Sequence, residues 1–502
     1  MSLFKKMEPH KSSLSALCLY RKLLYAIFLC ALIFAGNIVM AKDAKLTKAK
    51  KWQIGKPIVT YWAGPGPLTE KDVKQMAEGG FNLALVYNLG KPSYLSLASH
   101  INAQLDLLQK YGMRGLVYAL DGRGLRGKGK IFLDVPKRRK KMDNLIDAIK
   151  NHPAVYGYVI IDEPHLKDFK RVARIKKYLL ERDPGHLAWV NLLPNYASAK
   201  QLETEGNRID AYKKHVKKYL DIVKPQLLSF DHYNFAVKGQ NDAYFLNLAQ
   251  VREAALKENI PFMAILQAST WSKNYAMPTG EQLRWLAYTS LAYGSQGIMW
   301  YVYGHSGHDG AFVYPKQPDE YYVPGTLYGG DPTPLYYFVK EELHKEFVNI
   351  AKELQALKSV GVYHTGMIPE GTIKLPKNNP FKLEPAVKTK ACPGFIGGHY
   401  KDHNGIYPVN LYKKPLEGFV IGCFGENEKT TYALIVNLDH RTYSGAGQER
   451  RKEFKNPVKR KIVGSGPLEV FDAKAGKWRD AKGNRVKLQL HPGSCILVRL
   501  RK

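Results

Sequence analysis

The chain is short of acidic residues, and that shortage sets its charge. Asp and Glu number 44 against 76 Lys and Arg, so the formal net charge is +32. A field of that sign favours polyanions and anionic surfaces as partners. The basic residues are spread along the whole chain, and no zinc-finger spacing, RNP-type motif or basic-region heptad accompanies them. The sequence therefore predicts no nucleic-acid binding.

Cysteine is equally scarce, with five residues in 502. Cys18 and Cys30 lie in the N-terminal segment, and Cys392, Cys423 and Cys495 lie in the C-terminal part. These last three allow one disulfide with one thiol left over. Their spacing matches no metal site, and no cysteine nucleophile is predicted. We predict no cofactor and no bound metal.

Long apolar runs are absent except near the N-terminus. A basic stretch precedes an apolar segment at 23–36, and Val39-Met40-Ala41 matches a small-x-small cleavage site. The apolar segment is short for a membrane span. We predict a signal peptide at 1–41, a secreted or periplasmic protein, and no stable membrane span once the signal is removed.

From 51 to 360 the sequence alternates between strand-like apolar runs and helix-like amphipathic segments. Eight strands, each followed by a helix, predict an α/β fold of the (β/α)8 barrel class. A doubly wound sheet fits less well, because no Gly-rich phosphate fingerprint follows any strand. Residues 361–410 are rich in Pro and Lys and are predicted as a linker. Short strands separated by turns at 411–502 predict a small antiparallel β-sandwich.

The stretch that best indicates chemistry is Tyr156-Gly-Tyr-Val-Ile-Ile-Asp-Glu-Pro-His165, which forms the fourth predicted strand. A continuous apolar run is typical of a buried parallel strand, and Pro164 ends its pairing. Asp162 and Glu163 therefore stand at the carboxyl end of the strand, where barrels place their active sites. A plainer interpretation is that the two acids only open the next helix.

Polar and aromatic residues end the other predicted strands and are expected at the same barrel mouth. The candidate substrate-binding residues are Tyr61, Trp62, Tyr87, Asp162, Asn191, His232, Tyr233, Gln267, Trp271 and Trp300, with Tyr118 and Tyr301 ending strands three and eight. Carboxylates, amides and aromatic faces in one pocket suit a carbohydrate. Hydrolysis of an acetal needs a proton donor and a second carboxylate. His165, His232 and His305 lie on the same loops, but their spacing matches no metal-binding motif.

The Tyr156–His165 stretch and Leu228-Ser-Phe-Asp-His-Tyr233 resemble the clan A (β/α)8 glycoside hydrolases, especially secreted bacterial members related to β-galactosidases and agarases. Members of that clan end strand four with an Asn-Glu pair. The Glu is the acid/base, and the Asn binds a neighbouring hydroxyl. The resemblance implies that Glu163 is the acid/base and that Asp162 takes the place of the Asn.

One departure from that pattern concerns the nucleophile, which the clan carries as a Glu at the end of strand seven. Gln267 occupies that position here. Asp231, which ends strand six, is one candidate for the second carboxylate. Alternatively, Asp162 and Glu163 share the work, with one kept protonated by the charge of the other. In a third alternative, the barrel has lost hydrolytic activity and only binds sugar.

The sequence thus predicts a glycoside hydrolase that cleaves a polysaccharide or oligosaccharide, with Glu163 and Asp231 as the catalytic pair. The positive charge favours an acidic or sulfated glycan. The alternative is a catalytically inactive carbohydrate-binding barrel. The separation of the two carboxyls decides the stereochemistry, since about 5 Å implies retention and roughly 6.5–9.5 Å implies inversion.

Overall fold

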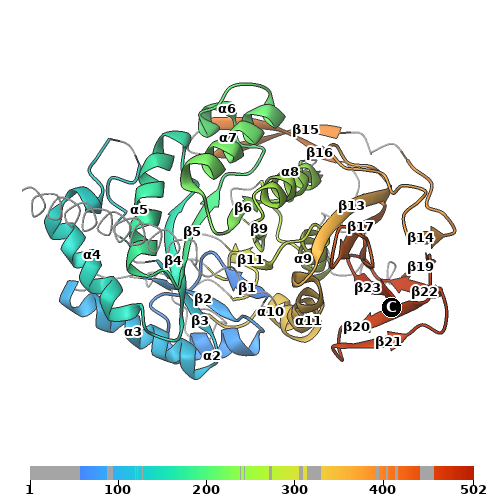
Figure 1. The fold of residues 1–502 in the computed structure, drawn as a ribbon, viewed down its shortest axis with the longest axis horizontal. Helices are drawn as coiled ribbons and strands as arrows, with labels where there is room; N and C mark the ends of the chain where they lie inside the picture. Colours follow the sequence, from blue (N-terminus) through green and yellow to red (C-terminus); the bar gives the residue numbers. More distant parts are fainter. Residues whose placement is uncertain are drawn as a thin grey trace, which may run out of the picture. The chain divides into compact units, whose positions relative to one another are not determined.

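The structure is a computed structural model (Figure 1). It describes residues 57–87, 94–118, 120, 122–126, 128–237, 239–241, 243–270, 274–304, 309–313, 330–390, 395–402, 405–412, 416–440 and 457–501. The predicted signal peptide at 1–41 lies outside these residues, as do Trp271, His305 and Cys392. No helix in the described ranges is both long and apolar enough to cross a membrane.

Eight parallel strands form the centre of the barrel, in the order β1-β11-β9-β6-β5-β4-β3-β2. Their bounds are β1 (Ile58–Tyr61), β2 (Leu83–Tyr87), β3 (Arg114–Tyr118), β4 (Val155–Asp162), β5 (Leu187–Leu192), β6 (Leu228–His232), β9 (Phe262–Gln267) and β11 (Gly297–Tyr301). Asn82 closes the seam between β1 and β2. Its N–H donates to Val59 O (3.1 Å), and its side-chain oxygen accepts from Val59 N (3.0 Å). The predicted (β/α)8 barrel is confirmed.

Helices follow the strands and cover the outside of the barrel (Figure 1). They are α2 (Glu70–Glu78), α3 (Tyr94–Lys110), α4 (Pro136–Ile149), α5 (Phe169–Arg182), α6 (Ala199–Leu202), α7 (Arg208–Val223), α8 (Tyr244–Lys257), α9 (Gly280–Ala292), α10 (Pro334–Phe338) and α11 (His344–Gln355). In α5 the buried side chains recur every three or four residues, for example Phe169, Val172, Ile175 and Leu179. This spacing places one apolar stripe against the strands.

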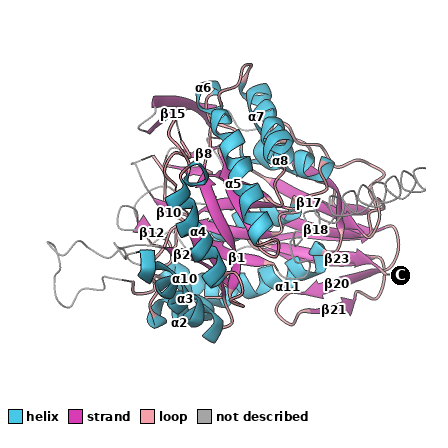
Figure 2. Cartoon of the chain, turned by 60° about the vertical axis from the view of Figure 1, so that its left-hand side comes forward, coloured by secondary structure: helices cyan, strands magenta, loops and turns pink. Residues whose placement is uncertain are grey.

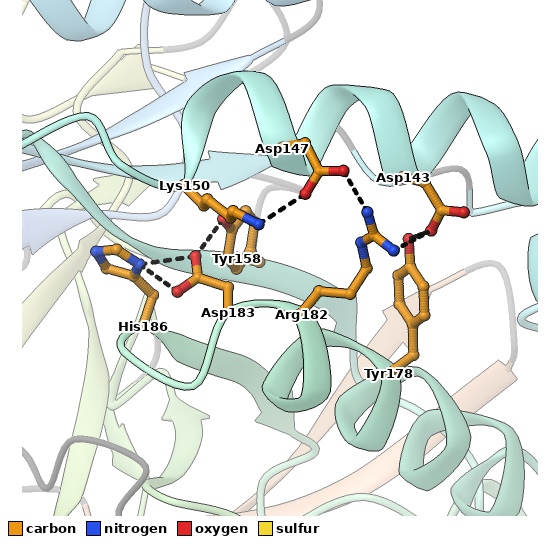
Figure 3. A network of polar contacts seen from close by, with 8 residues as sticks. All are labelled: Asp143, Asp147, Lys150, Tyr158, Tyr178, Arg182, Asp183 and His186. Carbon is orange, nitrogen blue, oxygen red and sulfur yellow. Dashed lines mark hydrogen bonds and ion pairs between the residues drawn. The ribbon is translucent and has the colours of Figure 1, made fainter. Parts of the chain in front are cut away.

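A polar network fixes β4 from the end of the strands opposite the predicted site (Figure 3). The Tyr158 hydroxyl donates to Asp183 Oδ2 (2.6 Å), and His186 Nδ1 lies 2.7 Å from the same oxygen. Arg182 at the end of α5 pairs with Asp143 on α4 (3.1 Å). Because the network joins β4, the turn before β5, and two helices, it holds the strand that carries Asp162 and Glu163.

The C-terminal strands form two antiparallel sheets, as the sandwich prediction required. The six-stranded sheet contains β13 (Lys358–Gly366), β17 (Gly418–Gly425), β18 (Tyr432–Asn437), β23 (Cys495–Leu500), β20 (Leu468–Asp472) and β21 (Lys477–Asp480) in that order. Figure 2 shows β17, β18, β23, β20 and β21 in this order. The second sheet contains β14 (Phe381–Glu384), β19 (Val458–Gly464) and β22 (Arg485–Leu490). Side chains of both sheets share one small core, including Phe381, Ile421, Ile435, Ile462 and Leu488. The sandwich is confirmed.

The predicted linker at 361–410 contains strands. Most of β13 lies within it, β14 follows, and β15 (Phe395–Asp402) pairs with β16 (Gly405–Tyr412). The β16 strand pairs with β8 (Gly239–Asn241), which itself pairs with β7 (Phe235–Ala236) after β6. The many Pro and Lys residues favoured a linker, but β14 is a short edge strand with alternate residues exposed, a position where Lys is tolerated.

The barrel and the sandwich share a continuous apolar core. The Trp285 indole N–H on α9 donates to Leu438 O (3.1 Å), and the Tyr293 hydroxyl lies 2.9 Å from His364 Nε2 on β13. Of the three C-terminal cysteines that allow one disulfide, Cys423 and Cys495 are both free thiols. They lie on strands on either side of β18, facing different residues of it, so no disulfide joins them.

Candidate active site

The backbone at the end of β4 departs from regular strand geometry at Glu163. The Glu163 N–H donates to Asn191 O (2.9 Å), which extends the pairing with β5 by one residue. Glu163 itself has φ +44°, in the left-handed region that non-glycine residues rarely occupy. Such a conformation costs on the order of 1–3 kcal/mol and clusters at functional sites. The surroundings of Glu163 therefore hold its backbone in a conformation that a non-glycine residue does not prefer.

Three carboxyl groups converge at this point. The Asn191 side-chain amide donates to Asp162 Oδ1 (3.0 Å) and to Asp231 Oδ1 (2.9 Å), and Ser229 Oγ donates to Asn191 Oδ1 (3.1 Å). The carboxyls of Glu163 and Asp231 are hydrogen-bonded to each other. Asp231 is buried at 2% exposure, whereas Asp162 and Glu163 are partly exposed. The predicted pair thus meets in one network that solvent can reach.

The environment raises the pKa of all three acids. Burial is the largest cause for Glu163, followed by the negative charges of Asp231 and Asp162. Burial and then Asp162 raise the pKa of Asp231. Burial also raises the pKa of Asp162 to about 6, against hydrogen bonding from Asn191 and the charge of Arg126. Since the shift is strongest for Glu163, we assign the shared proton to Glu163, which donates it to Asp231.

An aromatic wall stands next to the carboxyls. Trp62 packs edge-on against Trp189 (ring centroids 5.1 Å) and Tyr118 (6.0 Å), and Tyr87 lies 5.8 Å from Tyr118. The Tyr87 hydroxyl donates to Trp62 O (2.6 Å). Burial and then the charge of Asp162 raise the pKa of Tyr118, so this wall is close to the carboxyl network. Tyr118 is 39% exposed and offers part of its ring to a ligand.

Two further tyrosines lie near the carboxyls. Tyr233 and Tyr301 lie 5.0 Å apart between ring centroids. Burial raises the pKa of Tyr301 to about 12, and Asp162, Asp231 and Glu163 add to the effect. Burial and then Asp231 raise the pKa of Tyr233. Both phenols therefore stay protonated and act as hydrogen-bond donors.

Three predicted residues are turned away from this site. Tyr61 is fully buried, Trp300 donates its indole N–H to His344 Nε2 (3.0 Å), and His232 Nδ1 contacts Asn247 Oδ1 (3.0 Å). Each precedes or follows a residue that does face the site, because side chains alternate across a strand. A substrate contact of these three residues stays a prediction, because the sequence pattern marks the strand ends and not the face that each side chain occupies.

The side chain of Gln267 is hydrogen-bonded to backbone groups of two loops. Its Oε1 accepts from Phe235 N (2.7 Å), and its Nε2 donates to Phe235 O (3.0 Å) and Ala276 O (2.8 Å). The amide thus braces the loops after β6 and β9, and its predicted contact with a substrate stays a prediction. Trp189 is the residue that sequence reasoning missed, because it lies within β5 and not at its end. Its position two residues before Asn191 places it on the same face.

The ranges that the structure describes contain no group of three His, Cys, Asp or Glu side chains suited to a metal ion. His165, one of the histidines expected on the loops at the barrel mouth, contacts the backbone, because its Nδ1 lies 2.7 Å from Gln201 O.

No family model matches the sequence, and no curated protein sequence does. Solved structures do match. A GH42 β-galactosidase from G. stearothermophilus is 10% identical, with 90% of this chain and 100% of that chain covered and a TM-score of 0.45. A glycoside hydrolase family 5 mannosidase from Rhizomucor miehei is 14% identical, with 57% and 88% covered and a TM-score of 0.39. The β-galactosidase from the psychrophilic Marinomonas ef1 is 11% identical, with 61% of each chain covered and a TM-score of 0.33.

These likenesses to glycoside hydrolases concern the fold. The barrel assignment rests on the pairing of the eight strands in this chain.

Proposed function

We propose that the protein is a glycoside hydrolase with Glu163 as the general acid and Asp231 as the second carboxylate. The observation that carries this proposal is the hydrogen bond between the two carboxyls at the carboxyl end of the barrel strands. Glu163 holds a proton that a leaving oxygen can take, and Asp231, whose pKa burial and Asp162 raise to about 8, is the carboxyl of the pair that ionises first. Hydrolysis of an acetal needs these two roles.

The contact between the two carboxyls favours a retaining reaction. Partners in a hydrogen bond lie about 2.5–3.0 Å apart, which is shorter than either catalytic separation. The two side chains reach about 5 Å, the retaining distance, with a smaller movement than the roughly 6.5–9.5 Å of inverting enzymes. Asp231 is then the nucleophile, and Glu163 returns as the base that activates water.

The neighbouring residues fit a sugar ring. Asp162 and Asn191 offer an acceptor and an amide beside the catalytic pair, and Tyr233 offers a phenol. The Trp62 and Tyr87 wall provides an apolar face of the kind that packs against the C–H faces of a pyranose. A polysaccharide or oligosaccharide is the substrate class that these groups support.

An anionic or sulfated glycan is the substrate that charge favours. The net charge is +32, and the loop after β3 places exposed Arg126 against the backbone of Asp162 and Glu163. We also propose that the protein acts outside the cytoplasm, in the secreted or periplasmic space, on the basis of the predicted signal peptide at 1–41.

A second candidate is a barrel that binds carbohydrate without cleaving it. Gln267 favours it, because a neutral amide braced by backbone groups stands at the position of the clan's nucleophile. The two candidates agree on the ligand and differ in the chemistry of Asp231.

The test is release of reducing ends from a panel of neutral and sulfated polysaccharides. Wild-type protein should release sugar, more from the sulfated members and less as salt is added. Glu163→Gln and Asp231→Asn should each lower kcat/KM about 10²–10⁴-fold. Glu253→Gln, an exposed acid on α8, is the matched control and should behave as wild type. Binding to a glycan with no release from any of them would leave the second candidate standing and reject the first.

A further inference from the structure

Arg126 contacts the backbone that carries both acids of β4. It lies in the loop after β3, and its guanidinium donates through Nη1 to Glu163 O (3.1 Å) and through Nη2 to Asp162 O. A planar guanidinium is suited to two neighbouring acceptors, because its donors are fixed in a fork. One side chain thus bridges two consecutive carbonyl oxygens.

The strand pairing explains why these carbonyls need a donor. The pairing of β3 with β4 has Tyr158 as its last partner on β4, whereas β4 continues to Asp162. The end of β4 therefore extends beyond its β3 neighbour, and within the described part of the chain its carbonyls on that side have no ladder partner. Buried or half-buried carbonyls need hydrogen bonds. Arg126 supplies them from the loop that continues β3.

The contact with Arg126 also supports the left-handed backbone of Glu163. With φ at +44°, Glu163 occupies a conformation that costs on the order of 1–3 kcal/mol and persists only where neighbours enforce it. The Glu163 N–H is held by Asn191 O on the β5 side, and the carbonyl is held by Arg126 on the β3 side. The residue is thus fixed at both ends of its backbone.

The charge of Arg126 also acts on the acids. It opposes the effects of burial on the pKa of Asp162 and on the pKa of Glu163. The titratable and charged groups that face these two acids are Tyr87 on β2, Tyr118 on β3, Asp231 on β6, Tyr233 after β6, Tyr301 on β11 and Arg126 itself. Arg126 is the cation in this set. Without it, the pKa of both acids would rise.

We propose that Arg126 is a positioning residue that fixes the left-handed backbone of Glu163 and so directs the Glu163 carboxyl at Asp231. Its importance for catalysis rests on the proposed function, whereas its effect on the backbone and protonation of the acids does not.

The first experiment compares Arg126→Gln and Arg126→Lys with Lys128→Gln, which removes the same charge from the same loop. Misplacement of a catalytic group by about 1 Å can cost on the order of 10²-fold. Arg126→Gln should lower kcat by roughly 10–100-fold with a smaller change in KM. It should also move the basic limb of the pH profile to higher pH, because the pKa of Glu163 rises. Arg126→Lys should restore the pH profile but not kcat, since one ammonium cannot bridge both carbonyls. Lys128→Gln should match wild type.

The second experiment needs no activity. The infrared carbonyl band of protonated carboxyls, followed across pH, should show more protonated acid near neutral pH in Arg126→Gln than in wild type or Lys128→Gln. Its crystal structure should show Glu163 outside the left-handed region. An unchanged titration together with an unchanged Glu163 backbone would overturn the inference. If Arg126→Gln does not fold, Arg126→Lys provides the same backbone test. Wild-type inactivity on every glycan would reject the proposed function alone.

Discussion

Glu163 combines two features that reduce stability, a left-handed backbone and a proton shared with a neighbouring acid. Positions of this kind are typical of functional sites, where activity is retained at the expense of stability. Asp231, with 2% exposure, accepts hydrogen bonds from the side chains of Asn191 and Glu163. At the scale of single residues, the acids crowd one another, so removing one carboxyl should reduce the electrostatic repulsion on the others.

Glu163→Gln should therefore inactivate the protein and stabilise it at alkaline pH. A carboxyl whose pKa is raised by folding contributes stability below its unfolded pKa of about 4.3, and this is lost as pH rises towards the folded pKa. Gln cannot ionise and can still donate to Asp231. The melting temperature of the variant should exceed that of wild type at about pH 8 and approach it near pH 4.5. Calorimetry across this pH range measures the difference in melting temperature between variant and wild type, and Glu253→Gln should show no such trend. A lower melting temperature at pH 8 would contradict the assignment of the proton.

The element that positions the acids is β4, and both of its ends are held by side chains. Tyr158 and the turn containing Asp183 hold one end, and Arg126 holds the other. Burial acts to raise the pKa of Asp183, but hydrogen bonds from His186 and Tyr158 outweigh it, so the pKa lies below its ordinary value. Asp183 is therefore ionised in the folded protein at neutral pH. The Tyr158 hydroxyl donates to a charged, buried acceptor.

Tyr158→Phe should lower the free energy of unfolding by about 1.5–3 kcal/mol, the range for a hydrogen bond to a charged group. Urea denaturation at neutral pH measures this cost. Because the depressed pKa of Asp183 contributes stability that is lost as pH falls, the difference from wild type should shrink in acid. Tyr337→Phe, at 48% exposure, is the control and should stay within about 0.5 kcal/mol. Loss of activity without loss of stability would argue against a purely anchoring role for Tyr158.

At the scale of the molecule, the barrel and the sandwich pack as one apolar core. Gly422 on β17 marks how closely they approach, since a Cβ there would lie 2.2 Å from Ala292 O on α9. That neighbour is backbone and cannot move alone. The sandwich is thus part of the support of the barrel, and the two should unfold together.

Gly422→Ala should cost about 1–3 kcal/mol, as overpacking of a core does. Calorimetry should show one transition for wild type and one transition at lower temperature for the variant. Gly466→Ala is the matched control, because no atom lies within 4 Å of its added Cβ. Two separate transitions in the wild type would show that the barrel and the sandwich are independent.

Much of this arrangement follows from the sequence alone. Apolar runs and their turns predicted eight strands and the two acids at the end of β4, because burial on both faces of a parallel strand leaves a continuous apolar signal. The short strand-like C-terminal segments, separated by turns, predicted the antiparallel sandwich. These features depend on local pattern, which the chain carries at each position.

Only the tertiary structure decided which acid meets Glu163 and which aromatic residues face it. Asp231 is 68 positions away in the sequence from Glu163, and their contact depends on the closure of the barrel. Trp300 and Tyr301 are adjacent, yet one packs against α11 and the other approaches the carboxyls, a choice set by strand register. Gln267 and Arg126 likewise owe their roles to backbone groups brought near by folding. Side-chain identity is local, but the partner of a side chain is a property of the fold.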